Sequence, residues 1–232
     1  MFGLGYWLIF GGFFVLSIIV QSVMNSHMSR YSKEFLPSGL TGREVAEKML
    51  RENGIYDVRV TCIQGHLTDH YNPTDKTLNL SEEVYNGSSV ASAAVAAHEC
   101  GHAVQHAEAY YWLGLRSAMV PAVNIGGTLS TWVILAGLML MSFLQATSIG
   151  YYVAIIGIVL FALTTLFAFV TLPVEFNASR RALNWLENSN LVTGSAHDHA
   201  KDALSWAART YVVAALASLA SLLYYISLVD RR

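Results

Sequence analysis

The sequence predicts a mainly α-helical membrane protein with four transmembrane helices and a small α+β domain built from two polar segments. Long stretches without charge, a histidine-containing motif in an alanine-rich run, and an uneven distribution of basic residues support this fold class. Charged residues make up only 13% of the 232-residue chain, whereas soluble domains carry about 25%. This composition indicates that much of the chain faces lipid.

Three stretches lack Lys, Arg, Asp and Glu: Met1–Ser29, Ser117–Val174 and Thr210–Val229. Because one span needs about 20 apolar residues, the middle stretch suits two helices, joined by a turn at Gln145–Gly150. A buried core helix is the alternative for any single span, but four such stretches in so short a chain favour a membrane protein. The predicted spans cover residues 4–24, 119–144, 151–172 and 210–229.

The first span is interpreted as a retained anchor. A cleavable signal peptide would begin with a basic region and end at a small-x-small cleavage site. No basic residue precedes the apolar part here, and Gln21–Ser26 contains no such cleavage site.

A His-Glu-x-x-His motif occupies His98–His102 within the run SSVASAAVAAHECGHAVQHAEAYYW. Two histidines four residues apart lie one above the other on a helix, so both imidazoles can bind one Zn²⁺. The intervening Glu99 would then lie near a metal-bound water and act as its general base. A coincidental motif is the alternative, although Gly101 and Ala103 are small enough for the close packing that a metal site needs.

Basic residues predict which side of the membrane carries the motif. Twelve of the 14 lysines and arginines lie in residues 25–118 and 173–209, and basic loops are typically cytoplasmic. Two spans separate these segments, so the chain returns to the same side between them. We therefore expect a catalytic site on the cytoplasmic side, although Arg231 and Arg232 and the length of the first segment argue weakly against this orientation.

A catalytic zinc usually has three protein ligands and a water. His106 is one candidate for the third, but three imidazoles at these spacings span about 12 Å along a helix. His98 and His106 therefore cannot share one ion, and His106 is better interpreted as a polar-face or supporting residue. Glu175, in LPVEFNASRRALNWLE, is the stronger candidate because it follows a span on the same side. Its alternative role is to stabilise the N-terminus of a new helix.

The polar segments contain further elements. Residues 38–53 read as a helix with a Thr41/Glu44 capping box, ended by Gly54. Short strands are predicted within residues 55–64 and at Thr77–Leu80, with Ser81 capping the next turn. An edge strand beside the metal helix would be a docking place for an extended peptide.

The predicted organisation therefore has five segments and a small α+β, zincin-like catalytic domain built from two cytosolic segments. They are an anchor (1–24), a catalytic segment with the HExxH helix (25–118), a transmembrane hairpin (119–172), a second catalytic segment with the third ligand (173–209), and a transmembrane helix with a tail (210–232).

Several polar residues are candidates to support a ligand or to stabilise an oxyanion. Arg180 and Arg181 could donate to the oxyanion, although an arginine pair beside a span is more often a membrane anchor. His197 and His199 could also donate or form a second metal site, and the alternative is a solvated loop. Tyr71 and His70 are weaker candidates. Cys100 lies about 200° round the helix from His98, at about 100° per residue, so it is expected to be a buried filler.

The strings TLNLSEEVY, SVASAAVAAHECGHAVQH, LPVEFNASRRAL and AARTYVVAAL resemble the YugP family of bacterial membrane zinc metallopeptidases over nearly the whole chain. More distantly, the plan is similar to HtpX-type and CAAX-prenyl-type membrane proteases. The resemblance implies a gluzincin-like site in which His98, His102 and Glu175 bind one Zn²⁺ and Glu99 is the base. In the HtpX-type pattern an Asp four residues after the ligand Glu supports a ligand His. Ser179 occupies that place here, and Asn177 or Glu108 could substitute.

The function expected from this chain is zinc-dependent hydrolysis of peptide bonds, as an endopeptidase in the bacterial plasma membrane. Protein or peptide substrates and membrane lipid are the expected partners, and a net charge of −2 gives no indication of nucleic-acid binding. Two alternatives remain: a non-catalytic scaffold or chaperone with structural zinc, and a zinc amidase or lipid-cleaving enzyme. A structural site would need a fourth Cys or His ligand, and Cys100 points away.

Overall fold

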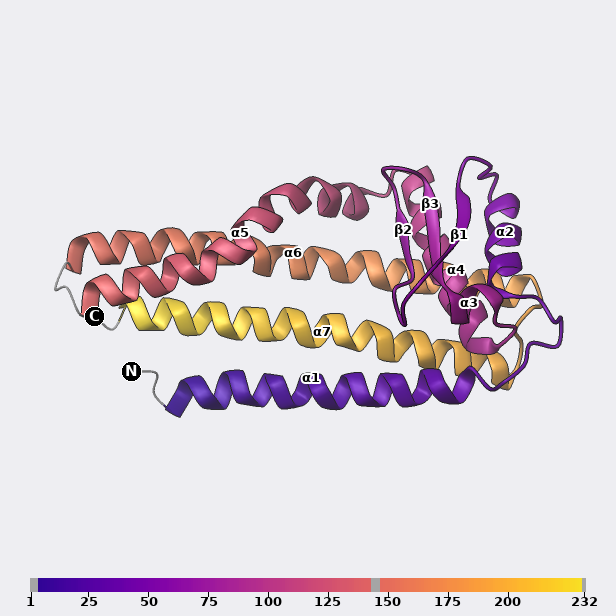
Figure 1. Cartoon of the computed structure of the whole chain (residues 1–232), viewed down its shortest axis with the longest axis horizontal. Coiled ribbons are helices and arrows are strands. Elements are labelled where there is room, and N and C mark those ends of the chain that lie inside the picture. Colours follow the sequence, from indigo (N-terminus) through magenta and orange to yellow (C-terminus); the bar gives the residue numbers. More distant parts are fainter. Residues whose placement is uncertain (1–3, 143–146, 231–232) are drawn as a thin grey trace. The chain divides into compact units, whose positions relative to one another are not determined.

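The structure is a computed structural model that describes residues 4–142 and 147–230 (Figure 1). Contacts divide the chain into two compact units. The apolar unit comprises Met1–Ile18, Leu115–Leu172 and Tyr211–Arg232, and the polar unit comprises Ile19–Gly114 and Pro173–Thr210. In chain order, the elements are α1 (Leu4–Tyr31), α2 (Gly42–Glu52), β1 (Arg59–Ile63), β2 (His70–Asn72), β3 (Thr77–Ser81), α3 (Glu82–Asn86), α4 (Val90–Ala107), α5 (Tyr111–Ser142), α6 (Thr147–Asn188) and α7 (Ser195–Asp230).

Four helices in the described part of the chain are long and apolar enough to cross a membrane, which confirms the predicted number. They are α1, α5, α6 and α7, and each is longer than its predicted span. The last two residues of the span predicted at 119–144 lie outside the described residues. Part of the predicted Gln145–Gly150 turn was wrong, because α6 already begins at Thr147; the remainder lies outside the described residues.

Helix α6 also continues through Pro173, where the sequence suggested that a span ends and a new helix begins. A proline within a helix removes one backbone hydrogen bond. Helix formers and buried contacts on both sides, among them Val170 and Ala178, maintain the helix across this position.

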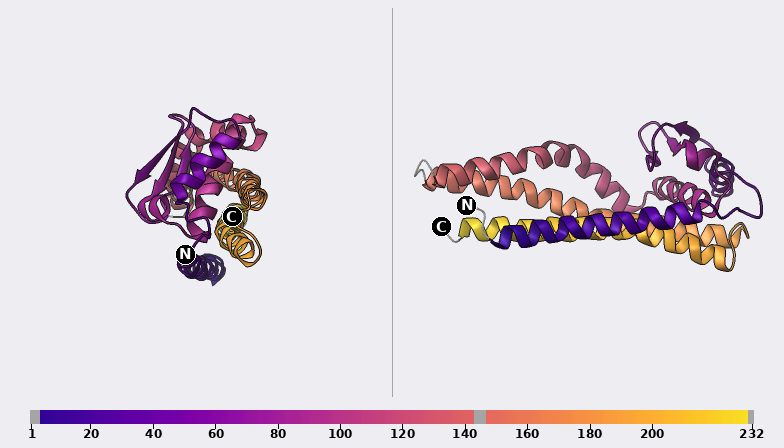
Figure 2. Two further views of the ribbon diagram at one scale, coloured as in Figure 1. Left: turned by 90° about the vertical axis from the view of Figure 1, so that its right-hand side faces the viewer. Right: turned by 60° about the horizontal axis from the view of Figure 1, so that its bottom comes forward.

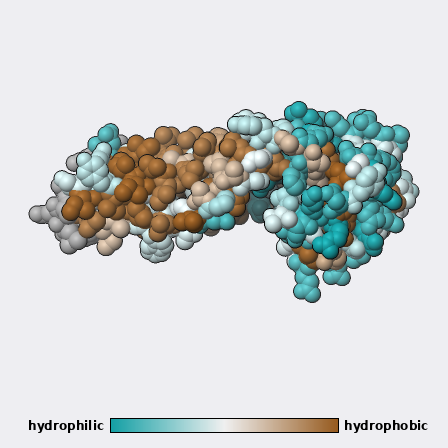
Figure 3. Space-filling model, turned by 90° about the horizontal axis from the view of Figure 1, so that it is seen from above, coloured by the Kyte–Doolittle hydropathy of each residue, from teal (hydrophilic) through white to brown (hydrophobic). Residues whose placement is uncertain are grey.

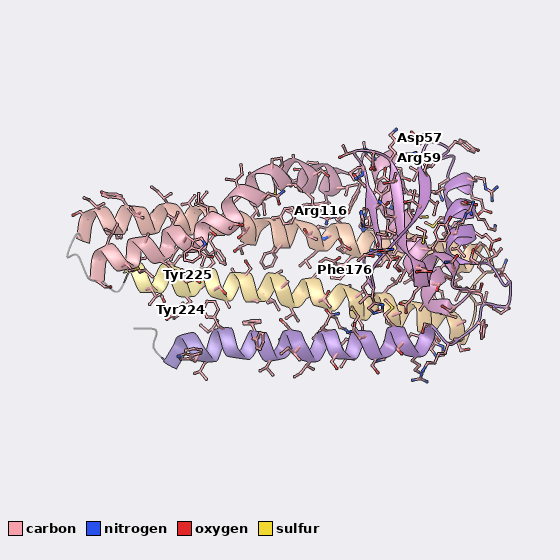
Figure 4. The ribbon with its side chains drawn as sticks, in the orientation of Figure 1. Asp57, Arg59, Arg116, Phe176, Tyr224 and Tyr225 are labelled. Atoms are coloured by element: carbon pink, nitrogen blue, oxygen red, sulfur yellow. The ribbon has the colours of Figure 1, made fainter. Side chains whose placement is uncertain are left out.

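The apolar unit is a set of closely approaching helices with a hydrophobic surface. Its core contains Ile134 of α5, Ala154 and Ile158 of α6, and Val229 of α7. A Cβ added to Gly157 would lie 2.6 Å from the backbone nitrogen of Ile134, so the absence of a side chain permits this approach. Tyr225 of α7 contacts Phe161 edge-on, with ring centroids 5.5 Å apart (Figure 4). Hydrophobic residues dominate the helical surface in Figure 3.

The polar unit contains a three-stranded sheet in the order β1-β3-β2, with β1 parallel and β2 antiparallel to β3. Helices α2, α3 and α4 pack against one another and against the sheet (Figures 1 and 2). Its core joins α2, β3, α4 and α6 through buried side chains that include Met49, Leu78, Leu80, Ala97 and Leu186. Asp57 forms an ion pair with Lys76 near the start of β1, beside Arg59 (Figure 4).

The local predictions for the polar unit are largely confirmed. The Thr41 side chain and the Glu44 side chain form the capping box, and Gly54 has the left-handed φ of +71° that follows the helix end. Strands β1 and β3 match the predicted positions, whereas β2 was not predicted. Ser81 precedes α3 without a side-chain capping bond, because its N–H and hydroxyl both donate to the Asp69 carboxylate.

Candidate metal centre

Helix α4 carries the HExxH motif, and most of its residues are buried. Its first turn is capped by the Ser89 hydroxyl, which accepts a hydrogen bond from the Ser92 N–H. Alanines surround the motif and are fully buried at positions 93, 94, 96 and 97, so neighbouring elements approach the helix backbone closely. The helix ends at Ala107, and Ala109 then adopts a φ of +51°.

His98, His102 and Glu175 come together in the polar unit. The Nε2 atoms of His98 and His102 lie 3.3 Å and 3.6 Å from Glu175 Oε2. One ligand atom from each residue lies within 4.8 Å of the others, and among the described residues this is the one group of three or more His, Cys, Asp or Glu arranged in this way. Glu175 lies in the interior of α6, so its role is not that of an acid at a helix N-terminus.

Gly101 allows α4 and α6 to bring these residues together. A Cβ at Gly101 would lie 2.7 Å from the carbonyl oxygen of Ala178 on α6. A real Cβ does not tolerate such a distance, so any larger residue would push the two helices apart. The small residue inside the motif therefore positions a ligand that is 73 positions away in the sequence from His102.

The Nδ1 atom of each imidazole has its own partner. Ser179 Oγ lies 3.1 Å from His98 Nδ1, so Ser179 occupies the place expected from the resemblance. Gln105 Oε1 lies 3.0 Å from His102 Nδ1. Both rings are held through Nδ1 with Nε2 directed toward Glu175. The sequence interpretation missed Gln105, although its position three residues after His102 places it on the same helix face.

Asn177 and Arg181 continue the hydrogen-bonded network from Gln105, on the side away from His102. Gln105 Nε2 donates to Asn177 Oδ1 at 3.0 Å, and Arg181 Nε donates to the same oxygen at 2.7 Å. Arg181 also pairs with Glu108 at 2.7 Å. Arg181 therefore joins α6 to the end of α4, whereas Arg180 is exposed.

Glu99 is largely buried beside the edge strand β2. The Tyr71 N–H donates to Glu99 Oε2 at 3.1 Å, and the Tyr71 hydroxyl lies 2.8 Å from His106 Nδ1. Burial, reinforced by the negative charges of Asp57 and Asp75, raises the pKa of Tyr71, so its hydroxyl stays protonated near neutral pH. His106 contacts Tyr71 and is not part of the group around Glu175.

The other candidates lie elsewhere. His197 faces Glu187 at 3.9 Å and His199 contacts Glu34 at 2.7 Å, so the described contacts direct them to different partners. They belong to the first turns of α7, which corrects the loop interpretation. His70 contacts the Thr68 carbonyl and Asn79 within the sheet region.

Cys100 is fully buried, and its thiol donates to the Ala46 carbonyl of α2. Burial raises the pKa of this thiol well above its usual value, so it is an unreactive filler. It does not supply a fourth ligand that would close the site.

Comparison with known proteins identifies the family of the chain. Residues 6–230 match the family described as "Putative neutral zinc metallopeptidase". The chain belongs to this family. It is also 42% identical over 211 residues to "Putative membrane protease YugP" of Bacillus subtilis (strain 168), covering 91% of this chain and 90% of the relative. No solved structure matches the chain.

The donor set of this zinc metallopeptidase family member fits Zn²⁺. Zinc is bound in proteins by imidazole nitrogen and carboxylate oxygen, and sites with two His and one Glu are known in hydrolases. Two imidazoles held through Nδ1 and one buried carboxylate provide this combination. Ligand imidazoles commonly donate their other N–H to a supporting acceptor, which matches the arrangement at His102.

Proposed function

We propose that this protein is an integral-membrane zinc endopeptidase that hydrolyses peptide bonds in the bacterial plasma membrane. The observation that supports this most directly is the convergence of His98, His102 and Glu175 within 4.8 Å. These three residues would hold one zinc ion. Bound there, zinc would acidify a water molecule and polarise the carbonyl of the scissile bond.

Glu99 is the proposed general base. It is adjacent to His98 in the motif, and its carboxylate is oriented by the Tyr71 N–H at 3.1 Å. In this role Glu99 accepts a proton from the attacking water and delivers it to the nitrogen of the leaving amine. The Tyr71 hydrogen bond fixes one carboxylate oxygen, and we assign the proton transfer to the other.

The edge strand β2 supports a peptide as the substrate. In the antiparallel pair, Tyr71 lies opposite Leu78, and its N–H is directed away from β3, toward Glu99. Because the N–H and C=O of one residue point to the same side of an antiparallel strand, the Tyr71 carbonyl also faces outward. It would accept from the main chain of an extended peptide aligned with this edge. Such recognition does not depend on a chain terminus, which favours cleavage within a chain.

The proposed topology places both polar segments in the cytosol, with lipid around the apolar unit. Twelve of the 14 basic residues lie in these segments. Large apolar side chains such as Trp132, Ile156 and Leu223 are exposed on the helices of the apolar unit, which suits contact with acyl chains.

The experiment that tests this function compares the wild-type protein with Glu99→Gln in detergent. We expect the variant to retain zinc, because Glu99 is not a ligand, and to lose hydrolysis of an unfolded protein by about 100- to 10,000-fold. Zinc content and cleavage are measured on the same samples. Glu82→Gln, on the exposed surface of α3, is the matched control and should remain fully active.

Three outcomes would contradict the proposal. Activity of Glu99→Gln within a few-fold of wild type would rule out the general-base role. A zinc-loaded wild-type protein that cleaves amide compounds but no peptide would favour the amidase alternative, and one that cleaves neither would favour a structural scaffold.

A further inference from the structure

Gln105 is a large, fully buried polar side chain next to the candidate metal centre. It lies on α4, and its amide group contacts α6 at two points: the Val174 carbonyl at 2.9 Å and Asn177 Oδ1 at 3.0 Å. Its oxygen faces His102 Nδ1. A buried polar group is costly unless it is fully hydrogen-bonded, so a full set of partners indicates a defined role.

The neighbours of Gln105 determine which way its amide points. The Val174 carbonyl can only accept, so the Gln105 NH₂ group must face it. Arg181 can only donate, so the Asn177 oxygen must face Arg181 Nε, and the Gln105 NH₂ again donates to that oxygen. Both constraints leave the Gln105 oxygen directed at His102.

The fixed amide in turn determines the tautomer of His102. An amide oxygen only accepts, so His102 Nδ1 must carry the hydrogen of the neutral ring. Nε2 then presents its lone pair on the side of Glu175, at 3.6 Å from Oε2. The opposite tautomer would place a lone pair against the Gln105 oxygen and a hydrogen where a metal would bind.

We propose that Gln105 is a positioning residue that sets the tautomer and orientation of His102 for metal binding. Val174, Asn177 and Arg181 fix the direction in which the Gln105 amide points. The proposal rests on the proposed function, because it assigns a role within the same centre. Glu108 completes the chain by pairing with Arg181 at 2.7 Å. This series of hydrogen bonds thus runs from the Arg181–Glu108 ion pair to the proposed ligand His102. The donor and acceptor roles of the groups along it cannot reverse.

His98 differs from His102 in this respect. Its partner is the Ser179 hydroxyl, which both donates and accepts. A hydroxyl adapts to either tautomer, so Ser179 does not dictate the state of His98. Loss of Gln105 should therefore affect metal binding more than loss of Ser179.

The test measures zinc and Co²⁺ dissociation constants of purified full-length variants by chelator competition, together with the Co²⁺ absorption spectrum. Gln105→Met keeps the volume but removes every hydrogen bond, and we expect affinity about 10- to 100-fold weaker. Gln105→Glu restores an acceptor for His102 Nδ1 but sets its second oxygen against the Val174 carbonyl and Asn177 Oδ1. It should therefore be less stable than the wild type, yet bind metal more tightly than Gln105→Met. Ser179→Ala should lose less affinity than Gln105→Met.

If Gln105 had a purely structural role, Gln105→Met would be less affected than Gln105→Glu. Met is tolerated in a buried position better than a carboxylate, so thermal stability alone would rank Gln105→Met above Gln105→Glu. Wild-type affinity in Gln105→Met, or affinity in Gln105→Glu no better than in Gln105→Met, would overturn the inference.

A second pair of variants keeps the test decisive if Gln105 variants do not fold. Asn177→Asp retains an acceptor for both Gln105 and Arg181, whereas Asn177→Leu removes it. We expect weaker metal binding only in Asn177→Leu, and equal affinities would contradict the relay. Failure of the proposed function is distinguishable: wild-type protein would then bind zinc with this pattern of affinities but hydrolyse no peptide.

Discussion

The helices of the two units serve different purposes. In the apolar unit, hydroxyl groups mostly bond within their own helices, as Ser130 does to the Gly127 carbonyl and Ser221 to the Ala217 carbonyl. In the polar unit, side chains form polar bonds between elements, such as Gln105 to Asn177 and Tyr71 to Glu99. Both units nevertheless rely on glycine where helices approach closely, at Gly157 and at Gly101.

This difference shows where chemistry can be placed in a largely apolar chain. Helices that face lipid need only pack, because their backbone groups are satisfied internally. A metal centre needs buried polar atoms, and each of them requires a partner with fixed geometry. The polar unit provides these partners from α4 and α6, while a short sheet orients the proposed base.

Glu175→Ala is expected to have the largest effect on zinc binding by the polar unit. Removing a direct ligand should weaken zinc binding by more than the about 100-fold that loss of a supporting partner causes, and hydrolysis should be lost with it. Zinc content after gel filtration measures the effect, and Glu187→Ala, at an exposed position of the same helix, is the control. Full zinc retention with a normal fold would move the third ligand elsewhere.

Cysteine labelling tests the side of the membrane on which the polar unit lies. Cys62 is exposed and Cys100 is buried, so a Cys100→Ser background leaves one accessible thiol. An impermeant thiol reagent should label Cys62 only after lysis if the polar segments are cytosolic. Labelling in intact cells would invert the topology and direct the search for substrates to the outside of the cell.

A smaller effect is expected when the glycine between α4 and α6 is changed. Gly101→Ala forces a Cβ into the space occupied by the Ala178 carbonyl oxygen, 2.7 Å away. Overpacking of this kind costs about 1–3 kcal/mol, and here it should also weaken zinc binding because it separates the ligands. Gly114→Ala, where a Cβ meets nothing within 4 Å, is the control.

The smallest effect on the metal is expected from the equivalent change in the apolar unit. Gly157→Ala brings a Cβ to 2.6 Å from the Ile134 nitrogen. It should lower the free energy of unfolding by about 1–3 kcal/mol, as at Gly101. The zinc dissociation constant should stay unchanged. A large change in zinc affinity would show that packing of the apolar helices controls the metal centre.

Local sequence signals predicted much of the polar unit. The Thr41/Glu44 capping box and the strands β1 and β3 follow from short-range patterns that tertiary contacts did not override. Strand β2 was missed because three residues contain too little alternation to indicate a strand. The break at Pro173 was wrong because a proline signal is local, whereas the packing that keeps α6 continuous is not.

By itself, the sequence determined the mainly helical fold, the number of helices long and apolar enough to cross a membrane, and the pair of histidines that can share an ion. These properties depend on composition and on spacings of four residues or fewer, which the helix converts directly into geometry. Only the tertiary structure decided that Ser179 faces His98 and which groups hold the Gln105 amide. The contacts of Gln105 with Val174 and Asn177 join residues 69 and 72 positions apart. Such contacts arise from the close approach of α4 and α6 at Gly101, and the spacing of residues along one helix does not encode them.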